Sequence, residues 1–165
     1  FFWRRPAAAL AVMILMTALT LTALHMTSAP PSYIGLAVAS HRSLQERTNP
    51  ASYKPFSDQE QALLSVSQIA FPRLPADWRV VDVELVRTAD MPAMLLAIQT
   101  AEGRTLSILA IKERSSAPRE PDTVREGSQS VAYWRKGDFS YALTGEGDPG
   151  QIDATADALA DSWRT

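Results

Sequence analysis

The sequence contains no cysteine and only two histidines, and both scarcities restrict its chemistry. Without a thiol the chain forms no disulfide, carries out no thiol catalysis and offers no cysteine ligand to zinc or an iron–sulfur cluster. Beyond residue 32 the one imidazole is that of His41, whereas histidine-based zinc sites use two or three. No metal site is therefore expected.

Sequence motifs of catalysis are also missing. There is no G-x-S-x-G segment to hold a nucleophile, and His41 is the only imidazole beyond residue 32 that could act as a base. The glycines at residues 145–147 are not expected to bind a phosphate, because this segment is interpreted as lacking both the G-x-G-x-x-G spacing and the strand-to-helix context of a dinucleotide fold. We therefore expect no catalytic residues, no bound cofactor and a protein that is not an enzyme.

The distribution of charge argues against a nucleic-acid partner. All 18 acidic residues lie beyond residue 32, together with all but two of the 16 basic ones, so this part has a formal charge of −4. A negatively charged domain repels the phosphate backbone that dominates nucleic-acid affinity. We expect no direct contact with nucleic acid.

Residues 7–26 form an apolar run of twenty residues without a formal charge when His25 is neutral. A helix of this length extends about 30 Å, the thickness of a bilayer's hydrocarbon core. Arg4 and Arg5 precede the run and no lysine or arginine follows before Arg42, so its N-terminal end is expected in the cytoplasm. A cleaved secretory signal is the alternative, but its apolar region is normally shorter. The predicted parts are a cytoplasmic flank at 1–6, a transmembrane helix at 7–27, a linker at 28–32 and an outer domain at 33–165.

The outer domain is predicted to be of the α+β class. Helical spacing or capping signals mark three helices, at 33–47, at 57–70 and from Asp148 onward. The last is expected to pack on the sheet through a stripe of Ile152, Ala156, Leu159 and Trp163. Alternating or continuous apolar runs mark five strands, at 78–87, 91–99, 105–112, 128–135 and 139–144. In the third of these, Leu106, Ile108 and Ala110 are expected to face opposite to Leu109 and Ile111. Between them, residues 113–127 contain prolines, serines and scattered charges without a period, which predicts an irregular loop. This order predicts a five-stranded antiparallel sheet with helices packed on one face.

The hairpin formed by the last two predicted strands is the candidate protein-interaction site. Its candidate residues combine aromatic rings with a guanidinium, as protein-binding patches do; they are Tyr133, Trp134, Arg135, Phe139 and Tyr141. The alternative is that one face of the hairpin belongs to the core and the other is an ordinary amphipathic surface.

Two segments resemble those of proteobacterial single-pass transmembrane anti-sigma factors. The hairpin VAYWRKGDFSYALTGE at residues 131–146, followed by a short helix, resembles the C-terminal end of these proteins, and its best matches are Trp134, Gly137, Tyr141 and Leu143. The segment AVASHRSLQE at residues 37–46 is similar to their membrane-proximal part. The order of anchor, helix, sheet, aromatic hairpin and final helix is also similar.

The resemblance implies a function in transcription regulation and the stress response. In that family a cytoplasmic domain sequesters an extracytoplasmic-function sigma factor, and one helix crosses the bacterial inner membrane to a periplasmic domain. Because the chain opens with Phe1 rather than Met, the sigma-binding domain is expected upstream of it. The resemblance further implies regulated proteolysis by envelope proteases, and we expect the first cut at residues 28–32 or 113–127. Further expected partners are membrane lipid and a periplasmic protein. The alternative function is a membrane-anchored periplasmic adaptor or assembly subunit of an envelope complex.

Overall fold

The computed structural model describes residues 29–47, 58–67, 69–87 and 92–163. The chain divides into two compact units, Phe1–Pro30 and Pro31–Thr165, and every described helix and strand belongs to the second. The predicted cytoplasmic flank at 1–6 and transmembrane helix at 7–27 lie outside the described residues. Over the described ranges, no helix combines the length and the apolar character needed to cross a bilayer.

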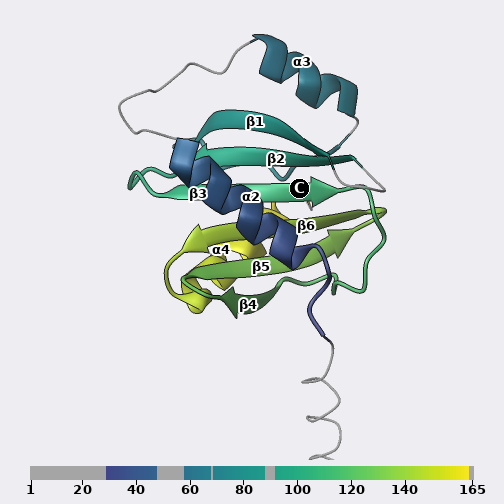
Figure 1. Cartoon of the computed structure of the whole chain (residues 1–165), viewed down its shortest axis with the longest axis vertical. Coiled ribbons are helices and arrows are strands. Elements are labelled where there is room, and N and C mark those ends of the chain that lie inside the picture. The colour runs from purple at the N-terminus through teal and green to yellow at the C-terminus, as the bar shows by residue number, and fades with distance from the viewer. Residues whose placement is uncertain (1–28, 48–57, 68, 88–91, 164–165) are drawn as a thin grey trace, which may run out of the picture. The chain divides into compact units, whose positions relative to one another are not determined.

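An antiparallel sheet of six strands forms the centre of the second unit (Figure 1). Neighbouring strands follow the order β1-β2-β3-β6-β5-β4, so the chain passes from β3 to the far edge at β4 and then returns through β5 to β6. The strands are β1 Arg79–Arg87, β2 Pro92–Gln99, β3 Thr105–Ile111, β4 Asp122–Glu126, β5 Gln129–Lys136 and β6 Phe139–Glu146. The helices are α2 Ile34–Arg47, α3 Asp58–Ser67 and α4 Pro149–Asp161.

Strand β4 lies within the segment 113–127 that the sequence predicted to be an irregular loop. It pairs with β5, and the register Glu126 opposite Gln129 leaves Gly127 and Ser128 as a two-residue turn. Gly127 has a φ of 64°, the positive value that such turns require at their first position. The prediction of five strands is therefore wrong, and the Gly-Ser pair is the hairpin signal that the surrounding prolines and charges obscured.

Helices cover both faces of the sheet, whereas cover on one face was predicted. Figure 1 shows α2 crossing the front of the sheet and α4 lying behind it. In β3, Leu106, Ile108 and Ala110 belong to the core beneath α4, whereas Leu109 and Ile111 belong to the core beneath α2. This division of β3 confirms the predicted alternation. Because the central strands are apolar on both sides, one layer of helices would leave half of their side chains in water.

Helix α2 is fixed to its face along one narrow stripe. The buried residues of the stripe recur every three or four positions and are Ile34, Ala37, His41 and Leu44. Just before the helix, the Tyr33 hydroxyl donates a hydrogen bond to the backbone carbonyl of Tyr141 at 3.3 Å. At its other end, Arg47 pairs with Glu84 of β1 at 2.5 Å. Contacts along the whole length of α2 therefore hold it on the sheet.

Helix α4 begins at Pro149, directly after Asp148, as the sequence predicts. Its buried residues, Ile152, Ala156 and Leu159, form the predicted stripe against the opposite face of the sheet. Trp163, just beyond the helix, packs against the same core. Trp163 also contacts Lys136, the last residue of β5, so the C-terminal end of α4 lies close to the end of β5.

Candidate functional site

Three of the five predicted interaction residues are core side chains. Trp134 and Tyr141 are each 1% exposed on the face covered by α4, and their rings stack with centroids 5.5 Å apart. Tyr133 is buried on the face covered by α2, and its hydroxyl donates to Asp122 Oδ2 at 2.8 Å. Burial and the hydrogen-bonded Asp122 carboxylate raise the pKa of Tyr133 to about 12. These rings stabilise the sheet from both sides, in agreement with the core alternative for the hairpin.

The other two predicted residues are half-buried and lie nearer the surface. Phe139 packs at a tilt beside Tyr141, with ring centroids 6.5 Å apart. The Arg135 side chain donates from Nε to the backbone carbonyl of Ala117 at 3.3 Å. Its backbone N–H donates to the carbonyl of Pro118 at 2.7 Å. Arg135 therefore ties the connection that follows β3 to the end of β5, and an interaction role for these residues remains a prediction.

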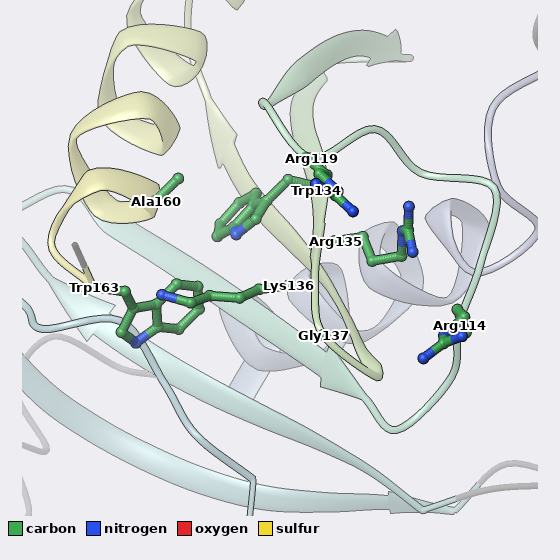
Figure 2. Close-up of a pocket in the computed structure, with 8 residues that line it drawn as sticks. All are labelled: Arg114, Arg119, Trp134, Arg135, Lys136, Gly137, Ala160 and Trp163. Carbon is green, nitrogen blue, oxygen red and sulfur yellow. The ribbon is translucent and has the colours of Figure 1, made fainter.

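A pocket of about 390 Å³ opens beside this junction (Figure 2). The connection after β3 contributes Arg114 and Arg119 to its wall, and the end of β5 contributes Arg135 and Lys136. The remaining wall is formed by the residues Trp134, Gly137, Ala160 and Trp163. Four cationic side chains from two separate segments thus surround one cavity.

Lys136 and Trp163 form one side of this basic pocket. The Lys136 ammonium lies 4.3 Å from the centroid of the Trp163 ring, in a cation–π contact. The indole N–H of Trp163 donates to the carbonyl of Phe71 at 2.8 Å, and its ring tilts against Tyr141 at 4.9 Å. Trp163 is therefore held in place, so the pocket has one fixed aromatic wall.

The guanidinium groups of the pocket differ in how far they are neutralised. Arg114 pairs with Asp138 at 2.6 Å, and both side chains are largely exposed, at 71% and 69%. Exposed ion pairs of this kind contribute little to stability. Arg135 is bound to a neutral carbonyl. For Arg119 the structure gives no hydrogen bond or ion pair with any described residue.

The Trp134 indole nitrogen is a buried donor without an acceptor. Nε1 has less than 1 Å² of exposed area and no hydrogen-bond partner among the described residues. Figure 2 shows this nitrogen on the ring edge that faces Lys136 and Trp163. A buried N–H that is not hydrogen-bonded costs about 1–3 kcal/mol. An acceptor that entered the pocket at this point would recover part of that cost.

A second cluster of polar side chains lies between α2 and the sheet, around His41. His41 Nδ1 and Ser107 Oγ are hydrogen-bonded at 2.8 Å, and His41 is fully buried. Three further buried atoms here have no partner among the described residues: His41 Nε2, Gln129 Oε1 and Thr144 Oγ1. Burial lowers the pKa of His41 to about 4, although the Glu146 carboxylate acts in the opposite direction. The imidazole is therefore neutral at pH 7.

Gly145, Gly147 and Gly150 have the G-x-G-x-x-G spacing, and β6 leads directly into α4 at this point. The predictions that this segment lacks the G-x-G-x-x-G spacing and lacks a strand-to-helix context are therefore both wrong. The segment nevertheless differs from a dinucleotide site in two respects, because the sheet is antiparallel and Asp148 stands at the N-cap of α4. A carboxylate at that position opposes a bound phosphate.

In the described parts of the chain, no group of three or more histidine, aspartate or glutamate side chains is placed to hold a metal ion. Of the basic pocket, the sequence singled out Trp134 and Arg135 but not Arg114, Arg119, Lys136 or Trp163. These residues come from three segments that meet only in the folded chain, so no local pattern marks them.

No protein-family model matches the chain, and no curated protein sequence matches it. Among solved structures, the chain is similar to one in the crystal structure of MucB in complex with MucA(peri), with a TM-score of 0.40 and 16% sequence identity. The similarity covers 55% of this chain and 34% of that chain, so this chain spans about a third of its length.

Proposed function

We propose that this chain is the membrane anchor and periplasmic domain of a single-pass transmembrane anti-sigma factor in a bacterial inner membrane. The observation that carries the proposal is the order in which the segments follow one another along the chain. A run of twenty uncharged residues follows two arginines, and a folded α+β domain begins within ten residues of its end. The N-terminus is in the cytoplasm, and the sigma-binding segment precedes Phe1. The domain acts by binding and carries out no catalysis.

The tight attachment of α2 supports a role for the domain in controlling the segment before it. Ile34 and Ala37 are buried in the first turns of α2, so the folded domain begins only a few residues after the predicted span. A protease that must reach the linker at 28–32 therefore works close to the domain surface. Any change in the domain that altered access to this linker would change the rate of cleavage and the release of the sigma factor.

The proposal is tested by purifying the full-length protein, with its region upstream of Phe1, and identifying the proteins that bind to it. We expect a sigma factor at stoichiometric amount, lost when the upstream region is deleted. As a control, deletion of residues 31–165 leaves the sigma factor bound, because the contact is cytoplasmic. Recovery of envelope proteins alone, through residues 31–165, would instead establish the anchored adaptor.

We expect the first regulatory cut within residues 28–32 rather than within 113–127. Ala29 and Pro30 are exposed, whereas the connection after β3 is bound to the sheet at several points. The Ser140 hydroxyl donates to the Glu113 carbonyl at 2.6 Å, and Ala117 is buried. Proteases cleave backbone that is accessible or locally unfolded. Sequencing the new termini of fragments from stressed cells is the measurement, and termini confined to 113–127 would contradict the expectation.

A further inference from the structure

We infer that the basic pocket beside the end of β5 is a binding site for a phosphate group carried by a small molecule or a lipid headgroup. The inference goes beyond the proposed function and does not depend on it. It rests on the charge of the pocket, on the donor without an acceptor at Trp134, and on the aromatic wall at Trp163.

The charge of the pocket is opposite to that of the domain around it. From Ser32 onward acidic residues outnumber basic ones by four, yet the pocket wall contains three arginines and one lysine. Like charges held close together repel one another unless an anion lies between them. Asp138 pairs with Arg114 at the exposed rim, and the Arg135 guanidinium contacts only a neutral carbonyl. A bound anion would offset the charges of Arg119 and Arg135, which form no ion pair with a described carboxylate.

The indole N–H of Trp134 supplies a directional contact for this anion. Its nitrogen has no partner among the described residues and faces Lys136 and Trp163 (Figure 2). A phosphate oxygen is a strong acceptor for such a donor. Because Nε1 is covered in the present structure, the oxygen reaches it only after a local rearrangement of the side chains that line the pocket.

A phosphate group fits this set of donors better than a carboxylate does. Its three terminal oxygens can accept bonds from several guanidinium groups and an indole at once, whereas a carboxylate has two. The cavity of about 390 Å³ also leaves room for the group that carries the phosphate. That group would lie against Trp163 and Ala160, which favours an apolar or planar substituent.

The test is a titration of the full chain, in a non-ionic detergent, with inorganic phosphate, phenyl phosphate and a water-soluble short-chain phosphatidic acid. The readout is the indole N–H signal of Trp134 in a nitrogen–proton correlation spectrum. We expect a saturable shift, with phenyl phosphate binding more tightly than inorganic phosphate. Added sodium chloride should weaken the binding, since salt screens the charges. Arg119→Gln and Lys136→Gln should each weaken it about tenfold, the loss expected for one charge-assisted contact.

Matched controls are Arg42→Gln and Lys112→Gln, which remove the same charges from exposed positions outside the pocket. They should bind as the unaltered chain does. The inference is overturned if no probe gives a saturable shift, or if the control variants weaken binding as much as the pocket variants. A shift with phenyl phosphate would assign the site to soluble phosphate esters. A shift with phosphatidic acid alone, lost in Arg119→Gln, would assign it to a lipid headgroup.

Discussion

Replacing Trp134 with alanine is expected to destabilise the domain by about 3–5 kcal/mol, a large part of the stability of an ordinary domain. The ring is 1% exposed, stacks on Tyr141 and belongs to the core beneath α4. Truncation would leave a cavity in the middle of that core, which the backbone of two paired strands cannot close. Denaturant unfolding of the chain in mild detergent, followed by circular dichroism, measures the loss.

Trp134→Phe is the matched variant, because it keeps an aromatic ring in the stack and removes the indole nitrogen. Since that nitrogen has no acceptor among the described residues, no hydrogen bond is lost. We expect a cost of about 1–2 kcal/mol, from the smaller volume alone. A cost as large as that of alanine would contradict this expectation and would mean that the indole nitrogen makes a stabilising contact.

Acidification is expected to destabilise the domain through His41. Burial lowers the pKa of His41 to about 4 from an ordinary value of 6.5. Between these values the unfolded chain binds a proton that the folded chain does not, so stability falls as the pH falls from about 6.5 to about 4. The full effect is about 3 kcal/mol, from 1.36 kcal/mol for each unit of pKa. The measurement is the free energy of unfolding over this pH range.

The double variant His41→Leu/Ser107→Ala isolates this effect. It replaces a hydrogen-bonded buried pair by apolar groups, so neither partner is left unsatisfied. All other titrating groups remain in both proteins, and the difference between their pH profiles therefore belongs to His41. We expect the variant to lose much less stability between about pH 6.5 and pH 4. Parallel profiles for the two proteins would show that His41 does not titrate on unfolding.

The destabilisation by Trp134→Ala and the destabilisation by acid would arise on opposite faces of the sheet. Trp134 belongs to the core beneath α4, whereas His41 lies on the buried side of α2, the first described helix after the predicted membrane span in the sequence. Loss of stability at His41 would therefore loosen α2 before it disturbed the basic pocket. Hydrogen exchange of the α2 amides at low pH, compared with that of β5 and β6, would separate the two responses.

Patterns along the sequence determined most of the individual elements. Strand alternation placed Leu106, Ile108 and Ala110 opposite Leu109 and Ile111, and the structure confirms that division. The stripe of α4 and the entry at Asp148-Pro149 were also correct. These features depend on the periodicity of burial and on local capping, which act over a few residues and are therefore visible in the sequence.

Only the tertiary structure decided how these elements combine. Strand β4 is short and charged, and its pairing with β5 gives it an extended form that its own composition does not favour. Cover on both faces follows from the apolar area of the whole sheet, which is a property of all strands together. The basic pocket is the clearest case, because Arg119, Lys136 and Trp163 are far apart in the chain and become neighbours only when α4 packs beside the end of β5. Local patterns thus determined the helices and most of the strands, whereas long-range packing decided the edge of the sheet and the site.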